Sequence, residues 1–207
     1  MFIERPASKK SLGQRKPVYG VGINDADYVT GYMDGGRLNQ CPYYRVWINM
    51  FVRCYSDSFH KKSHTYKGCS VSLEWIKFSA FKEWMKLSDW KGMHLDKDLL
   101  YPNNRVYGPD ECIFVTPHIN SLITDSKAAR GAYPIGVCFS KSHNKFSSRC
   151  NVNGKKITLG YFDSANDAAK TYREFKASHI EDLAKNYGHD SRLYSALIRR
   201  AEFIRNS

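Results

Sequence analysis

Residues 133–180 constrain the fold of this chain more than any other stretch, because they combine strand-like runs, tight turns and one capped helix. Three short β-like runs come first, at residues 135–140, 145–151 and 156–161. Tight polar turns join them, at Ser142-His143-Asn144 and at Asn153-Gly154. Consecutive strands joined by such short turns predict a three-stranded antiparallel sheet.

A helix is predicted directly after the three runs. Ser164 and Asp167 have the spacing of a capping box, and the small residues Ala168 and Ala169 allow the helix to lie close to a sheet. The sheet face under this helix is predicted to carry Val137, Phe139, Phe146, Ser148, Cys150, Ile157 and Leu159. The sequence therefore predicts an α+β protein in which residues 131–185 form a small domain of three strands packed on one helix.

The opposite sheet face is predicted to be polar and cationic. Its residues are Ser140, Ser147, Arg149, Asn151, Lys156 and Thr158. A ribbon of this width fits the major groove of DNA, where Arg and Asn can contact base edges while Lys and Ser hold phosphates. The formal net charge of +12 agrees with a polyanionic partner. A sheet that binds another protein is the alternative.

This stretch resembles the DNA-binding domain of the plant ethylene-response-factor (APETALA-type) family. The matching elements are Gly136-Val137, Phe146-Ser147-Ser148, Gly154-Lys155, Leu159-Gly160-Tyr161-Phe162, and Ala168-Ala169 with Tyr172. The resemblance implies that DNA is contacted by Cys138, Ser140, Arg149, Asn151, Lys156 and Thr158. We add Lys145 and Ser147 to this predicted DNA-binding set, since they lie on the same polar side.

A second informative block lies upstream, at residues 93–125. Met93–Leu99 alternates apolar and polar residues, Glu111–Val115 favours a second strand, and Thr116-Pro117 is a suitable start for a helix. If that helix packs across the two strands, Asp96 and Asn120 can converge on one divalent cation, which would polarise a phosphate. Alternatively, this face of the strand is simply its hydrated side.

The strand-loop-strand-helix order resembles the ββα-metal core of HNH endonucleases. The resemblance places the metal-binding aspartate at Asp96, the loop asparagine at Asn104 and the helix ligand at Asn120. Lys97 stands where the family has the histidine that deprotonates water. An ordinary lysine, with a pKa of about 10.4, is already protonated at neutral pH. Lys97 is therefore a base only if its pKa is lowered strongly; otherwise it clamps a phosphate and His94, His118 or a metal-bound hydroxide takes the proton.

An HNH-like core followed by this sheet domain is similar to the layout of phage homing endonucleases. The resemblance implies a sequence-selective endonuclease that hydrolyses duplex DNA with Mg²⁺ or a similar ion, inside a bacterial host. A DNA-binding regulator with a degenerate HNH motif is the main alternative, and an RNA-binding protein is another. The sequence predicts no small-molecule cofactor and leaves the oligomeric state open.

The remaining segments are predicted from composition and periodicity. We expect a basic, irregular arm over residues 1–40, helices plus the HNH-like core over 41–130, and an amphipathic helix over 186–207. Two apolar stripes at helical spacing are assigned to a core: Tyr43, Val46, Trp47, Met50, Phe51 and Cys54, then Trp75, Phe78, Phe81, Trp84 and Met85. Ser72 is expected to cap the second of these helices.

The sequence favours neither a zinc site nor association with a membrane. Cys54, His60, His64 and Cys69 offer ligand types for zinc, but their spacing fits no compact finger, so we expect buried thiols and surface histidines instead. All six cysteines are expected to be reduced and mostly buried. No apolar run approaches the roughly 20 residues that cross a bilayer, and the first residues lack the apolar segment of a secretory signal. We therefore expect a soluble, cytoplasmic protein.

Overall fold

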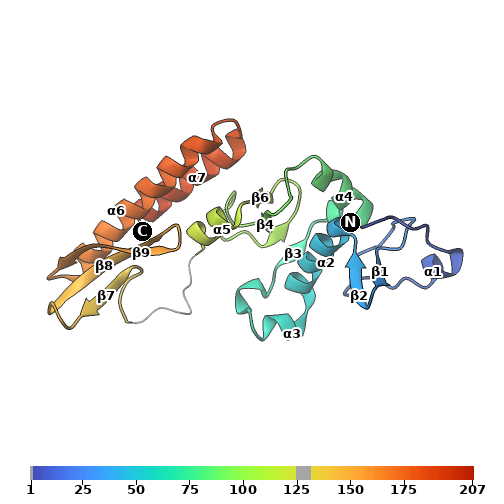
Figure 1. Ribbon diagram of the computed structural model, residues 1–207, viewed down its shortest axis with the longest axis horizontal. Coiled ribbons are helices and arrows are strands. Elements are labelled where there is room, and N and C mark those ends of the chain that lie inside the picture. The colour runs from blue at the N-terminus through green and yellow to red at the C-terminus, as the bar shows by residue number, and fades with distance from the viewer. Residues whose placement is uncertain (1, 125–131) are drawn as a thin grey trace. The chain divides into compact units, whose positions relative to one another are not determined.

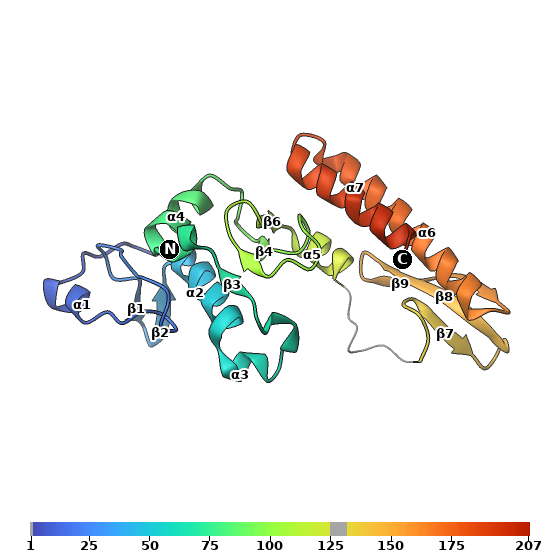
Figure 2. The same cartoon turned by 180° about the vertical axis from the view of Figure 1, so that it is seen from behind.

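A computed structural model describes residues 2–124 and 132–207 (Figures 1 and 2). The chain divides into two compact units, Met1–Thr116 (unit 1) and Pro117–Ser207 (unit 2). Both units combine helices with small sheets, which confirms the predicted α+β class. The predicted boundary at residues 130/131 and the end of the HNH-like block at residue 125 lie outside the described residues. Among the described residues, no helix is both long and apolar enough to span a membrane.

Unit 1 begins with the segment expected to be a basic arm. It contains α1 (Lys9–Gly13) and an antiparallel hairpin of β1 (Gly31–Asp34) and β2 (Arg37–Gln40). The segment is not extended, because Ala26 and Tyr28 are buried in the core and Ile23 forms a bridge with Lys77. Single buried residues without a period carry no sequence signal of helix or strand, which is why the sequence suggested a basic, irregular arm.

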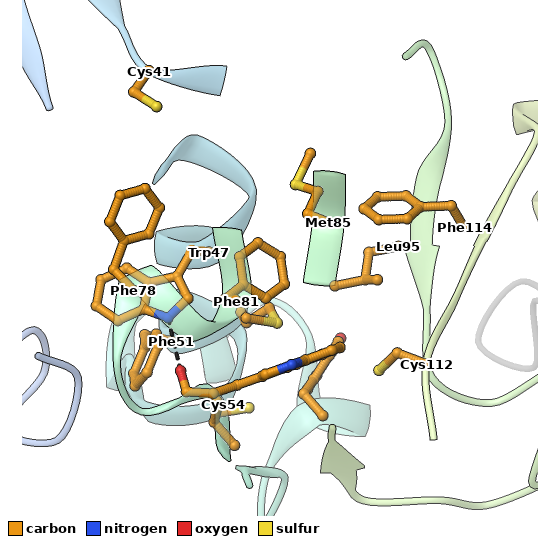
Figure 3. Packing of buried hydrophobic residues seen from close by; sticks show 14 of the residues in the cluster. Cys41, Trp47, Phe51, Cys54, Phe78, Phe81, Met85, Leu95, Cys112 and Phe114 are labelled. Atoms are coloured by element: carbon orange, nitrogen blue, oxygen red, sulfur yellow. Dashed lines mark hydrogen bonds between the residues drawn. The ribbon is translucent and has the colours of Figure 1, made fainter. Parts of the chain in front are cut away.

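The two predicted apolar stripes form the centre of unit 1. The segments here are α2 (Pro42–Tyr55), α3 (Asp57–His60), η1 (His64–Tyr66), β3 (Ser70–Val71), η2 (Leu73–Trp75) and α4 (Phe78–Lys86). Trp47 of α2 is fully buried, and its ring contacts both Phe51 and Phe78. Figure 3 shows the Trp47 indole donating to the backbone carbonyl of Trp75 across 2.8 Å. This bond satisfies the one polar atom that the buried indole carries.

The start of the second helix differs from the prediction. Helix α4 begins at Phe78, after a separate 3-10 turn, and Lys77 occupies its N-cap position. Ser72 precedes that turn, and its hydroxyl is buried without a hydrogen-bond partner among the described residues. The helical period of the apolar residues continues through the turn, so the sequence pattern did not show where the α-helix begins.

The predicted strand pair of the HNH-like block is present but short. Strands β4 (His94–Asp96) and β6 (Ile113–Val115) pair antiparallel, and β5 (Val106–Tyr107) pairs parallel with β3. Leu95 and Phe114 belong to the same core cluster as Met85, and Figure 3 draws both on the Met85 side of that cluster. Helix α5 (Pro117–Ile123) follows β6 in sequence and is the first element of unit 2.

Unit 2 contains the predicted sheet and helix. Strands β7 (Val137–Ser140), β8 (Lys145–Val152) and β9 (Lys155–Phe162) form an antiparallel sheet in the order β7-β8-β9, as predicted. Helix α6 (Ala165–Ala184) packs on all three strands, with Ala168 and Ala169 buried. After the turn η4 (Lys185–Tyr187), α7 (Ser191–Arg205) packs along α6, and both ribbon views show the two helices side by side (Figures 1 and 2).

Three local details shape the sheet and the helix that covers it. Gly136 has a φ of 77°, and a Cβ there would lie 2.1 Å from the ring of Tyr172, so only glycine fits beneath this helix. The register of β8 and β9 shifts beside Arg149, which pairs with Thr158 while the neighbouring Ser148 pairs with Gly160. The Ser164 hydroxyl caps α6 by accepting from the backbone N–H of Asn166 rather than from Asp167.

Candidate catalytic and nucleic-acid-binding sites

Asp96 stands at the end of β4, where its side chain organises the following turn. Its Oδ1 accepts hydrogen bonds from the backbone N–H groups of Asp98, at 2.9 Å, and Leu99, at 2.7 Å. These bonds end the strand at Asp96, which is why the predicted strand over residues 93–99 is shorter than expected. Burial raises the pKa of the Asp96 carboxyl, and the two backbone hydrogen bonds oppose that rise.

The carboxylate of Asp96 is a suitable ligand for a divalent cation. Its second oxygen, Oδ2, receives no hydrogen bond from the part of the chain that the structure describes. Magnesium prefers oxygen ligands and is usually held by one or two carboxylates together with waters and substrate phosphates. A carboxylate fixed through one oxygen and unengaged at the other suits that role.

Lys97 and Asn104 hold each other through reciprocal hydrogen bonds across the loop between β4 and β5. The Lys97 ammonium donates to Asp98 Oδ1 at 2.6 Å and to the Asn104 carbonyl at 2.7 Å. Only 6% of Lys97 is exposed. The Asn104 amide donates to the carbonyls of Lys97, at 2.9 Å, and Val106, at 2.6 Å, and its oxygen accepts from the Val106 N–H. Both side chains therefore shape the loop, and their predicted catalytic roles stay predictions.

The remaining predicted catalytic and metal residues are divided between the units. His94 lies two residues before Asp96 on β4, so both side chains fall on the same strand face, and His94 is exposed. His118 and Asn120 lie on α5, in unit 2. Asp96 and Asn120, the predicted metal pair, therefore belong to different units.

One basic group that interacts electrostatically with Asp96 was not anticipated from the sequence. Arg53 of α2 is half-buried, interacts electrostatically with the Asp96 carboxylate, and donates to the Tyr107 hydroxyl at 3.3 Å. The sequence feature that could have pointed to Arg53 is its position next to Cys54, at the end of the first apolar helix stripe. An arginine keeps its charge at any physiological pH and can contribute to binding a phosphate.

The four zinc-type residues do not gather into a site in the described part of unit 1. Burial, followed by the nearby Cys69, raises the pKa of the Cys54 thiol to about 12, and burial also raises the pKa of Cys69. His60 makes a 2.8 Å hydrogen bond to the carbonyl of Arg53. No group of three or more His, Cys, Asp or Glu side chains converges among the described residues. All six cysteines are free, and every one except Cys138 is buried.

The face of the sheet opposite α6 is partly as predicted. Asn151, Lys156 and Thr158 are exposed there, and Arg149 is half-buried. The Arg149 Nε is buried without a hydrogen-bond partner among the described residues, and no ion pair to a described residue neutralises its guanidinium. We call these four residues the open face. Lys145, also half-buried, is paired with Asp163 at 3.1 Å.

Three other residues predicted to contact DNA use their side chains for hydrogen bonds within the domain. Ser147 is fully buried, and its hydroxyl donates to the Cys138 carbonyl at 3.0 Å. Ser140 is 8% exposed and hydrogen-bonds to the ring of His143 at 3.1 Å. Cys138 is half-buried, and its thiol lies 3.1 Å from the Ser147 hydroxyl. The serine side chains are therefore not presented to a ligand, which strand alternation alone did not reveal.

An aromatic pair outside the predicted set lies at this end of the sheet. The rings of His143 and Tyr161 stack with centroids 3.9 Å apart, and both residues are exposed. Tyr161 pairs with Ser147 across the sheet, so the stack lies beside the buried serines. The turn that carries His143 was predicted, but its fold over Tyr161 was not.

Comparisons of the chain with protein-family models, with curated proteins and with solved structures each return no match.

Proposed function

We propose that this protein binds duplex DNA through the open face of unit 2 and hydrolyses a DNA phosphodiester at a divalent cation held by Asp96. Binding would be sequence-selective, and the resemblance to phage homing enzymes suggests action inside a bacterial host. The observation that carries the proposal is the open face itself, where Arg149, Asn151 and Lys156 lie on the side of strands β8 and β9 that α6 does not cover.

The DNA-binding part rests on chemistry that suits a major groove. Arginine and asparagine side chains can make paired hydrogen bonds to base edges, and a lysine can hold a phosphate. The unpaired guanidinium of Arg149 has no competing acid among the described residues. The net charge of +12 supplies the long-range attraction that nucleic-acid binding requires.

The nuclease part rests on Asp96 and its neighbours. A divalent cation bound by Asp96 would polarise a phosphate oxygen and stabilise the leaving oxygen. Arg53 would add positive charge next to the same phosphate. His94 lies on the same strand face as Asp96, and an imidazole can accept a proton from water at neutral pH. We therefore assign the base to His94 rather than Lys97.

DNA binding without cleavage is the second candidate, and one observation favours it. Lys97 occupies the position of the family's catalytic histidine, and its ammonium is engaged with Asp98 and Asn104. An ammonium has three donors and no acceptor, so in this arrangement it cannot receive a proton. The protein would then be a regulator that keeps the fold of a nuclease.

A nicking assay separates the two candidates. Supercoiled plasmid carrying random inserts is incubated with protein in Mg²⁺, Mn²⁺ or EDTA, and binding to duplex DNA and duplex RNA is measured in parallel. The proposal expects metal-dependent nicking by the wild type, loss in Asp96→Asn and in His94→Gln, and retention in Lys97→Gln. Asp34→Asn, an exposed acid of β1, is the matched control. Tight DNA binding without nicking in either metal supports the regulator, and preferential RNA binding contradicts both.

A further inference from the structure

Unit 2 contains a row of basic side chains, called here the cation row, that the proposed function does not use. Arg173, Lys176 and His179 follow one another at three-residue steps along α6, so their side chains are neighbours on one side of the helix. All three are half-buried. Arg200 of α7, the helix packed along α6, is also half-buried and adds a fourth basic side chain.

No acid in the described part of the chain pairs with this row. Three acids of α6 form their ion pairs elsewhere: Glu174 and Glu181 with Arg205, and Asp182, which also acts electrostatically on His179, with Lys185. Arg200 donates to the backbone carbonyl of Ile123 at 2.9 Å and lies over the Phe203 ring, and no ion pair to a described acid neutralises its charge. Half-buried cations without a counter-charge are unusual, since burial of a charge is favourable only with a partner.

Three side-chain nitrogens of the row are buried without an acceptor among the described residues: Arg173 Nε, His179 Nε2 and Arg200 Nε. Buried donors normally have partners, and those left without one in a native structure indicate a missing acceptor. A ligand with negative charge and several acceptor oxygens would supply the kind of partner that these nitrogens lack.

Burial and neighbouring basic groups lower the pKa of two members of the row. Burial lowers the pKa of Lys176, and Arg200 lowers it further. Burial also lowers the pKa of His179, with Lys176 and then His118 of α5 adding to the effect. An anion bound here would oppose the effect of these basic neighbours.

We propose that Arg173, Lys176, His179 and Arg200 form a binding site for a phosphate group. In the proposed function that phosphate belongs to the DNA backbone, so this part of the inference rests on duplex DNA being the partner. Through this site, unit 2 would contact a phosphate of the DNA backbone at a place separate from the open face. Such a contact anchors DNA without regard to base sequence.

The first arm of the test uses duplex DNA. Binding of one duplex is measured over a series of salt concentrations for the wild type, Lys176→Gln and Arg173→Gln. We expect each variant to bind roughly tenfold more weakly on every sequence and to lower the salt slope of log Kd by about 0.9, as for one lost phosphate contact. Lys185→Gln removes the same charge from the C-terminal end of α6, where Lys185 is exposed and already paired, and should leave the slope unchanged.

The second arm uses inorganic phosphate alone and follows the imidazole proton signals of His179 by NMR. We expect phosphate to shift the His179 signals in the wild type and not in Lys176→Gln, with the fold of both confirmed by circular dichroism. If the wild type binds no duplex DNA but phosphate shifts His179, the site stands and the proposed function fails. If DNA binds while the variants match Lys185→Gln and phosphate leaves His179 unmoved, the site is disproved and the proposed function stands.

Discussion

Asn104 and Lys97 hold each other in place from opposite sides of a loop. The Asn104 amide donates to the Lys97 carbonyl at 2.9 Å, and the Lys97 ammonium donates to the Asn104 carbonyl at 2.7 Å. The pair fixes the backbone directly after Asp96, and with it the carboxylate proposed to hold the cation. Residues expected to act on substrate are therefore also the ones that shape the site.

Asn104→Ala should destabilise unit 1. The substitution removes two donated and one accepted hydrogen bond and leaves buried carbonyl groups unpaired, at a cost of about 1 to 3 kcal/mol for such a loss. Urea denaturation followed by tryptophan fluorescence measures the change. The control, Asn151→Ala, removes an exposed asparagine and should change the unfolding free energy by less than about 0.5 kcal/mol. Equal stabilities for the two variants would contradict the role of Asn104.

Ser147→Ala and Lys156→Gln should affect different properties, although both residues were predicted to contact DNA. Ser147 is buried and donates to the Cys138 carbonyl, so its loss should reduce stability by about 1 kcal/mol and leave DNA affinity unchanged. Lys156 is exposed, so its loss should weaken DNA binding on all sequences and leave stability unchanged. Thermal unfolding and fluorescence anisotropy measure the two effects. A DNA-binding defect in a fully folded Ser147 variant would show that the hydroxyl is presented after all.

Gly136→Ala should destabilise unit 2 far more than Gly154→Ala. Both glycines have positive φ, at 77° and 78°, so alanine costs about 1 to 2 kcal/mol at either position for the backbone alone. At Gly136 the new Cβ would also overlap the Tyr172 ring, whereas nothing lies within 4 Å at Gly154. The clash adds about 1 to 3 kcal/mol. Thermal unfolding of both variants measures the difference, and similar melting temperatures would mean that α6 can move away from the sheet.

His179 should make the protein less stable in acid. Its pKa in the folded state is lowered by burial, by Lys176 and by His118, with only Asp182 opposing. The unfolded chain therefore binds a proton more readily, so this contribution to stability is present above a pH of about 6.5 and is lost as the pH falls through the folded pKa. Urea midpoints at pH 7.5 and 5.5 should differ less in His179→Gln than in the wild type.

His189→Gln is the matched control for that measurement. His189 is exposed, lies in the loop before α7 and should not alter the pH dependence. If His179→Gln retains the full acid sensitivity of the wild type, His179 does not cause it. Added phosphate should also reduce the acid sensitivity of the wild type, because an anion at the cation row favours protonated His179.

Local sequence patterns were sufficient to predict the secondary structure of unit 2 and the core of unit 1. Strand alternation, the Asn153-Gly154 turn and the Ser164 cap together predicted the three-stranded sheet and the helix that follows, because each depends on a few adjacent residues. The two apolar stripes likewise identified the core around Trp47 and Phe78. The backbone conformation and the amphipathic faces were determined at this level.

Tertiary packing decided which side chains remain available to a ligand. Ser147 alternates with outward-facing residues yet is buried, because neighbouring strands and the turn after Ser140 close over it. Ala26 and Tyr28 join the core without any period, and Lys97 is engaged by a carbonyl seven positions along the chain. Two glutamates of α6, Glu174 and Glu181, pair with Arg205 of α7 rather than with the row from Arg173 to His179. Burial and pairing depend on residues distant in sequence, so local pattern determines the elements and packing determines the sites.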